Sequence, residues 1–193
     1  VKEAPVEDDG VKMEAGHDAG FHPDISLCDG GTISGPGWTL EAIPTPGHTS
    51  NHLCFALKEE NAIFSGDHIM GWSTTVITPP DGDMGDYMRS LDVIRARNFT
   101  TLWPTHGAPV RDVNPFIDAY IAHRRGREAQ IEKALAAGPS KIVDLVPVLY
   151  ADVDKRLYPA AARSMLAHMI DLTRRGRVAA DGGPQADSVY RLT

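Results

Sequence analysis

One pattern constrains the fold of this chain more than any other, and it occurs three times. An apolar, β-type run of residues leads into a loop that contains Pro or Gly and also carries a His or an Asp; the loops are Pro46-Gly47-His48, Ser65-Gly66-Asp67 and Thr105-His106-Gly107. Proline lacks a backbone donor and glycine readily adopts positive φ, so a strand ends where they cluster. Rigid scaffolds place reactive side chains in such loops. The pattern therefore predicts a sheet with functional residues at its strand ends.

The three polar residues of these loops, His48, Asp67 and His106, are of the types that bind metals. Neutral imidazole and carboxylate are the usual ligands of Zn²⁺ and similar ions. A single His after Pro-Gly is more often a plain turn residue than a ligand. Three such loops in order, each following a strand, favour a metal site.

The first half of the chain is predicted to contain strands and one helix. Short apolar runs alternate with turns, and the expected strands are Ile25–Leu27, Thr32–Ile33, Trp38–Ile43, His52–Leu57, Ala62–Ser65 and Phe99–Trp103. Apolar residues at helical spacing predict a helix over residues 83–97.

The second half is predicted to be helical, with a hairpin at its end. The expected helices cover Asn114–Ala136, 142–149 and about 159–175, and the hairpin strands are Val178–Ala180 and Ser188–Leu192. Ser140 is expected to cap the second of these helices. Three helices followed by a hairpin are typical of a winged-helix domain.

Charge also divides the chain. The net charge is −7, but residues 1–111 carry 7 Lys and Arg against 16 Asp and Glu, a balance of −9, whereas residues 112–193 have a balance of +2. With the change from strands to helices, this indicates two domains, residues 1–123 and 124–193. The net charge argues against nucleic-acid binding by the chain as a unit. No run approaches the roughly 18 consecutive apolar residues that a membrane-spanning helix needs, so we do not expect the chain to be a membrane protein.

Several other residues have structural interpretations. Cys28 and Cys54 are too few for a disulfide scaffold or a multi-cysteine zinc module, and Cys54 is expected to be buried and inert. His52 and His68, near the loops, are expected to have structural roles. The basic run Arg174–Arg177 suits a helix C-terminus. The segment Thr78–Asp83 is expected to flank the metal site.

The three loops in their sequence context resemble the later metal motifs of the metallo-β-lactamase fold. The motifs are Thr45-Pro46-Gly47-His48-Thr49, Ile63-Phe64-Ser65-Gly66-Asp67 and Pro104-Thr105-His106-Gly107. The chain is most similar to the β-lactamase-like-protein-2 subfamily, also in Glu60–Asp67, Thr74–Val76 and Asp86–Leu91, from about residue 38 to the C-terminus. The resemblance implies an α/β fold: the αββα metallo-β-lactamase sandwich, represented by its C-terminal half only, followed by a winged-helix domain.

The resemblance also implies a binuclear site that holds two Zn²⁺ or other divalent ions. By position, His48 is similar to the third histidine of the first metal site, and His106 to the histidine of the second. Asp67 is similar to the carboxylate that bridges the metals, which makes it the expected catalytic residue. Two ions about 3.5–4 Å apart activate a hydroxide and stabilise the charge that develops during hydrolysis.

The first metal motif of the family, His-x-His-x-Asp-His, does not occur in this chain. The run His17–His22 has the residue types but not the spacing, and the chain begins at Val1 without an initiator Met. We therefore expect the chain to be a piece of a longer protein, and to be inactive or weakly active alone.

The intact protein is expected to be a cytoplasmic, metal-dependent hydrolase. Some members of the subfamily that this chain resembles are ribonucleases, so single-stranded RNA is the first substrate class that we expect. The acidic first half instead favours a small thioester, ester or lactone. A third hypothesis, a non-catalytic interaction module, applies if the chain is naturally this short. Assembly into homo-oligomers is left open.

Overall fold

The computed structural model describes residue 20 and residues 22–193. Its first unit is a mixed sheet with the strand order β1-β2-β3-β4-β5. The strands are β1 (Thr32–Gly35), β2 (Trp38–Pro44), β3 (Leu53–Leu57), β4 (Ala62–Gly66) and β5 (Thr101–Pro104). Neighbours from β1 to β4 are antiparallel, and β5 joins β4 in parallel. A parallel pair requires a crossover, which α1 (Met84–Ala96) supplies.

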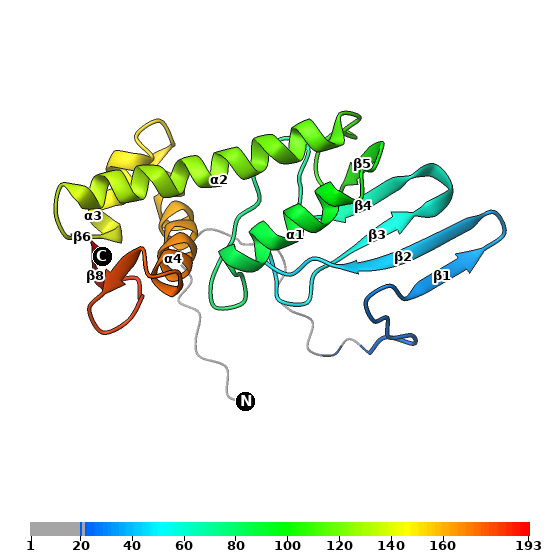
Figure 1. Ribbon diagram of the computed structural model, residues 1–193, viewed down its shortest axis with the longest axis horizontal. Coiled ribbons are helices and arrows are strands. Elements are labelled where there is room, and N and C mark those ends of the chain that lie inside the picture. The colour runs from blue at the N-terminus through cyan, green and yellow to red at the C-terminus, as the bar shows by residue number, and fades with distance from the viewer. Residues whose placement is uncertain (1–19, 21) are drawn as a thin grey trace.

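Helices cover one face of this sheet (Figure 1). Alternate residues of neighbouring strands, Ala56, Ile63 and Leu102, are paired in register and buried on that face. They pack in one cluster with the apolar stripes of α1 and α2 (Val113–Ala136), which include Tyr87, Leu91, Ile94, Ile117 and Ile121. The core therefore lies between the sheet and these two helices.

The opposite face of the sheet is also apolar, but it is less covered within the described residues. Phe55, Phe64 and Trp103 are paired across β3, β4 and β5, and Phe64 is 42% exposed. Because side chains alternate along a strand, this face is separate from the buried one. The sheet thus has two apolar faces, which is typical of the inner sheet of a layered α/β fold.

Helix α2 continues from the first unit into a second (Figure 1). The second unit contains α3 (Ile142–Leu149), α4 (Tyr158–Arg174) and a small sheet with the order β6-β8-β7. The strands of that sheet are β6 (Ser140–Lys141), β7 (Val178–Ala180) and β8 (Val189–Leu192). There are also two short helices, η1 (Lys58–Glu60) between β3 and β4 of the first unit and η2 (Lys155–Leu157) before α4 of the second. Met165 and Met169 are buried in its core with Ile131, Leu135 and Tyr190. No helix in the described part of the chain is long and apolar enough to cross a membrane.

The predicted elements agree with these bounds to within a few residues, with two exceptions. Ile25–Leu27 is not a strand but an irregular segment, and Ile25 is 67% exposed. A three-residue run without a pairing partner has no sheet to join, whatever its β propensity. The run His17–His22, apart from Gly20 and His22, lies outside the described residues.

The second exception concerns Ser140, which does not cap α3. Ser140 lies in β6 and pairs with Tyr190 of β8. The residue at the N-cap of α3 is Lys141, which makes no side-chain capping bond. Pairing with β8 supplies hydrogen-bond partners for the Ser140 backbone. The predicted hairpin of β7 and β8 therefore gains β6 as a third strand.

Candidate metal centre

The loop that carries His48 joins β2 to β3 and is fastened to α1. Gly47 has φ +137°, and a Cβ there would come within 2.3 Å of the Tyr87 Cα, so only glycine allows this approach. The Asp83 amide donates to the Gly47 carbonyl at 2.9 Å, and the Ser90 hydroxyl donates to the Pro46 carbonyl at 2.8 Å. The first turns of α1 therefore set the position of His48.

The His48 ring is oriented by a backbone carbonyl. Its Nδ1 lies 2.8 Å from the Val76 carbonyl oxygen, which can only accept a hydrogen bond. Nδ1 therefore carries a proton, and it is Nε2 whose lone pair is available to a metal in the neutral ring. Metal-binding histidines commonly donate their second ring nitrogen to a carbonyl in this way.

The loop that carries Asp67 follows β4 and is organised by Thr75. The Thr75 hydroxyl lies 2.7 Å from the Asp67 carbonyl and 3.0 Å from the His68 carbonyl. The Asp67 Oδ1 atom is buried and has no hydrogen-bond partner. A buried carboxylate oxygen without a donor is costly, and a bound cation would remove that cost.

His106 meets Asp67 from the end of β5. Its Nε2 lies 3.6 Å from Asp67 Oδ1, and its carbonyl accepts a bond of 2.7 Å from the Gly71 amide. Gly107 has φ +106°, and a Cβ there would lie 2.7 Å from the Gly71 Cα. The backbones of the Asp67 and His106 loops therefore touch, which brings carboxylate and imidazole together. Their chemistry fits a divalent cation such as Zn²⁺.

Two further histidines extend from this site into the core. The His52 ring lies 6.3 Å from the His48 ring and 5.6 Å from the His68 ring, which is 4.5 Å from the Tyr87 ring. Burial lowers the pKa of His52 to about 4, with a smaller contribution from His48 and an opposing one from Asp67. Burial also holds the pKa of His68 well below its usual range. Both rings are neutral at physiological pH.

His52 and His68 differ in their hydrogen bonds. His52 Nδ1 lies 2.8 Å from the Thr45 hydroxyl, which also contacts the buried Cys54 thiol at 3.2 Å. Both ring nitrogens of His68 are buried without a partner. Burial raises the pKa of Cys54 to about 12, so this thiol stays protonated and inert, as predicted.

The structure brings the expected ligands together only in part. Asp67 and His106 are in contact, whereas His48 is linked to them through His52, whose pKa both His48 and Asp67 influence. Among residues 20 and 22–193, no group of three or more His, Cys, Asp or Glu side chains is arranged to hold a metal. The three-residue metal site remains a prediction.

Residues that support the loops were missed by the sequence analysis. Arg124 of α2 is buried, donates from Nη2 to the Thr75 carbonyl, and lies 5.2 Å from the Tyr87 ring centre. The Tyr120 hydroxyl lies 2.5 Å from the carbonyl oxygens of both Met70 and Ser73, to which it can donate its one hydrogen. The available signal was position, since Arg124 continues the buried i, i+3, i+4, i+7 stripe of Ile117, Tyr120 and Ile121.

Comparison with known families identifies both units. The family described as the metallo-beta-lactamase superfamily matches residues 2–106, and the beta-lactamase associated winged helix domain matches residues 142–186. A beta-lactamase-like protein 2 homolog of Caenorhabditis elegans is 39% identical over 142 residues, covering 73% of this chain and 47% of that protein. An atrochrysone carboxyl ACP thioesterase of Aspergillus fumigatus is 32% identical over 168 residues, covering 77% and 52%. The chain thus spans about half the length of these relatives.

Solved structures agree on the fold. A beta-lactamase domain protein from Burkholderia ambifaria aligns with a TM-score of 0.78 at 22% identity, covering 86% of this chain and 52% of that one. A metallo-beta-lactamase family protein from Thermus thermophilus aligns with a TM-score of 0.75 at 24% identity, covering 89% and 55%. At these identities the likeness concerns the fold, and it extends over both units of the chain.

Proposed function

Because the chain belongs to the metallo-beta-lactamase superfamily and carries the associated winged helix domain, we propose that the protein is a metal-dependent hydrolase whose metal ligands include His48, Asp67 and His106. The observation that carries the proposal is the buried Asp67 Oδ1, which has no hydrogen-bond donor and lies 3.6 Å from His106 Nε2. The His48 ring supports it, because the Val76 carbonyl leaves Nε2 with the lone pair that a metal requires.

The residues of this chain would bind and orient, and the metal would supply the electrophile. A divalent ion such as Zn²⁺, when bound, polarises the scissile bond and activates water at neutral pH. Asp67 contributes negative charge close to His106, and His48 contributes Nε2, since its Nδ1 donates to the Val76 carbonyl. The Thr75 hydroxyl keeps the Asp67 backbone in place, so the carboxylate does not rely on its own side-chain contacts.

A thioester or another small ester is the substrate class we propose. The Aspergillus fumigatus relative is named as an acyl-carrier-protein thioesterase, and residues 1–111 of this chain have a charge balance of −9, which disfavours a polyanion.

RNA, the first substrate expected from the sequence, gains no support from Arg174, Arg175 and Arg177, at the end of α4 and in the turn after it. Arg174 pairs with Asp83, Arg175 with Glu128 and Asp171, and Arg177 with Glu132. These side chains are engaged with carboxylates instead of forming a cationic patch that a phosphate backbone would need.

Domain division, oligomeric state and location stay predictions. Two cores support the proposed domains of residues 1–123 and 124–193, since α2 contributes Ile121 to the first core and Ile131 to the second, while Ala167 of α4 packs in the first. The proposed cytoplasmic location, and any assembly into homo-oligomers, require measurement.

The test compares substrates and metals on the full-length protein. We expect hydrolysis of an acyl thioester that is lost on dialysis against a chelator and restored by Zn²⁺. Asp67→Asn should lower kcat/KM at least about 100-fold, because it removes the charge that holds the metal. Asp144→Asn is the control, since Asp144 is an exposed acidic residue of α3, in the second unit.

The outcomes separate the hypotheses. Chelator-sensitive cleavage of single-stranded RNA without thioesterase activity would support the ribonuclease hypothesis instead. Hydrolysis that neither the chelator nor Asp67→Asn affects would contradict the proposed metal site. If the protein hydrolyses neither the thioester nor the RNA and binds no metal, the hypothesis of a non-catalytic interaction module is favoured.

A further inference from the structure

Arg174, at the C-terminal end of α4, reaches out of its own unit to the first. Its Nη2 lies 2.6 Å from Asp83 Oδ2 and its Nη1 lies 3.2 Å from Asp83 Oδ1. The two residues are 91 positions apart, and the contact is bidentate, the strongest arrangement of an Arg–carboxylate pair. Arg174 also holds the pKa of Asp83 below its usual range, so the carboxyl is ionised at neutral pH.

Asp83 connects this arginine to the loop that carries His48. The Asp83 carboxylate accepts the Asp86 amide at 2.9 Å and so caps α1. The Asp83 amide donates to the Gly47 carbonyl at 2.9 Å, one residue before His48. A single residue therefore binds α4 through its side chain and the His48 loop through its backbone.

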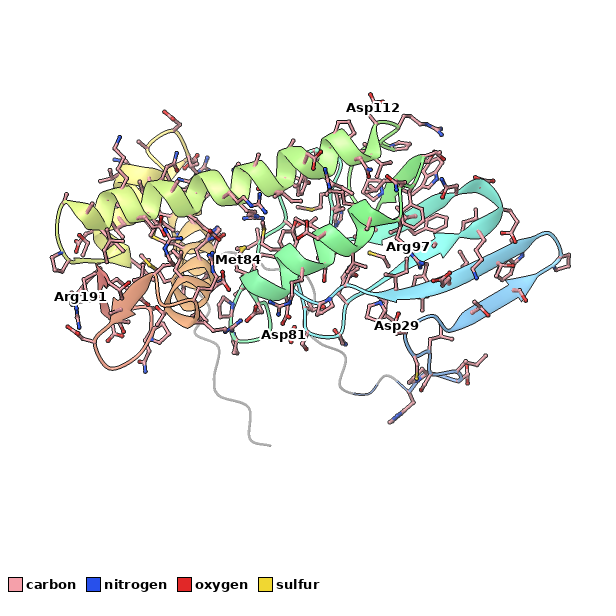
Figure 2. The ribbon with its side chains drawn as sticks, in the orientation of Figure 1. Asp29, Asp81, Met84, Arg97, Asp112 and Arg191 are labelled. Atoms are coloured by element: carbon pink, nitrogen blue, oxygen red, sulfur yellow. The ribbon has the colours of Figure 1, made fainter. Side chains whose placement is uncertain are left out.

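The residues next to Asp83 are closely packed, against the His48 loop on one side and against α4 on the other. A Cβ on Gly82 would lie 3.1 Å from the His48 carbonyl oxygen, and a Cβ on Gly85 would lie 2.7 Å from Asp171 Oδ1 on α4. Met84 lies in the first turn of α1, at the end of the helix next to α4 (Figure 2). The start of α1 is thus wedged between the His48 loop and the C-terminal unit.

We propose that Arg174 and Asp83 are positioning residues, through which the winged-helix domain holds the His48 loop in place for metal binding. The part of this proposal that concerns the metal rests on the proposed function of His48. The part that concerns the loop depends only on the contacts above, and it assigns the winged-helix domain a role in organising the site.

Neighbouring ion pairs provide controls because they do not reach the loop. Arg177 contacts Glu132 at 2.8 Å, and both residues lie in the C-terminal half of the chain. The Arg177 and Arg174 side chains are 58% and 52% exposed, so the two pairs have similar solvent access. Arg177→Gln removes a comparable pair without touching Asp83.

Amide hydrogen exchange of the 193-residue chain tests the inference without any metal. We expect Arg174→Gln to speed exchange of the Asp83 and Gly47 amides about two- to fivefold, the range that an exposed ion pair spans. The Leu102 amide of β5, which bonds the Val110 carbonyl at 2.9 Å in an isolated β-bridge, should not change. Arg177→Gln should leave all three amides as they are, and Arg174→Lys should restore part of the protection.

Two further arms separate positioning from general destabilisation. Asp83→Asn keeps a good helix cap and removes the charge, so adding Arg174→Gln to it should have no further effect. Raising the salt concentration should speed exchange of the Gly47 and Asp83 amides in the unsubstituted chain but not in Arg174→Gln. The proposal is overturned if Arg174→Gln leaves the Asp83 amide unchanged, or if it speeds Leu102 to the same degree.

Metal affinity of the full-length protein tests the second step. With competing chelator, Arg174→Gln should measurably weaken Zn²⁺ binding, by up to the factor found for loop opening, whereas Arg177→Gln should not change it. Faster loop exchange with unchanged Zn²⁺ affinity would contradict the metal part alone. Loss of loop protection in a protein that binds no Zn²⁺ would retain the positioning role and contradict the proposed function.

Discussion

His52 shows how burial controls the charge of a side chain beside the three loops. Burial lowers the pKa of His52 to about 4, against an ordinary value of 6.5. The unfolded chain therefore binds a proton between pH 6.5 and 4 that the folded chain does not. The stabilising contribution of neutral His52 is present above pH 6.5 and is lost as the pH falls through this window.

A difference of this size predicts a measurable pH dependence. The pKa change corresponds to about 3 kcal/mol of unfolding free energy between pH 7 and 4. His52→Gln retains a group that can bond the Thr45 hydroxyl but does not titrate, so we expect it to flatten the pH dependence of stability by up to this amount. Urea unfolding of the metal-free chain at pH 4.5 to 7 measures it.

His22→Gln is the matched control, because His22 is exposed on the surface. The interpretation fails if His52→Gln and the unsubstituted chain lose stability in parallel as the pH falls. His68, His123 and His168, whose pKa values burial also lowers, contribute to the pH dependence that should remain in the variant. Glu41 and Asp83 contribute as well, since their arginine partners lower the pKa values of these carboxyls.

At the scale of elements, α1 and α2 contain glycines in opposite environments. Gly126 lies in α2, and a Cβ built there meets no atom within 4 Å. Gly85 lies in the first turn of α1, where a Cβ would approach Asp171 Oδ1 to 2.7 Å. Helix propensity favours Ala over Gly equally at both sites, so packing decides the outcome.

We therefore expect opposite signs for the same substitution. Gly126→Ala should stabilise the chain by about 0.5–1 kcal/mol, because it restricts the unfolded chain and adds no clash. Gly85→Ala should destabilise it, since Asp171 is buried and held by Arg175 at 2.8 Å. Thermal and urea unfolding of both variants provide the comparison, and equal stabilisation by both would show that α4 does not press on α1.

At the scale of the whole molecule, α2 runs from the first core into the second. Arg124 lies between the helix residues of the first core and those of the second, and it is 3% exposed. Its guanidinium faces the Tyr87 ring and the Thr75 carbonyl, so it connects the helix to the Asp67 loop. His168 of α4, also buried, contributes to the same region, with Glu128 3.9 Å from its Nδ1.

Arg124→Ala should therefore destabilise the molecule more than a neighbouring substitution does. It leaves the buried Thr75 carbonyl without this donor and removes the cation–π contact, which together cost about 2–3 kcal/mol. Arg125→Ala, one residue along and exposed, is the control and should stay within about 0.5 kcal/mol of the unsubstituted chain. Equal effects of the two variants in urea unfolding would contradict the role of Arg124.

Much of this architecture can be predicted from the sequence. Apolar spacing placed α1, α2 and α4 close to their observed bounds, and the Pro- and Gly-containing loops after β2, β4 and β5 marked the ends of strands. These signals are local, because backbone sterics and side-chain periodicity act over a few residues. They fail where pairing with a distant strand decides, as at Ile25–Leu27, which has no partner, and at Ser140, which pairs with Tyr190.

The sequence by itself determined which residue types stand at the strand ends, and hence that carboxylate and imidazole chemistry was available at His48, Asp67 and His106. Only the tertiary structure decided that Asp67 Oδ1 would be buried beside His106, and that Arg124 and Arg174 would face the loops of Asp67 and His48. The reason is physical: a helix pattern specifies which side of α2 or α4 is apolar, but the partner of a charged group depends on which surfaces the packing of the cores brings together.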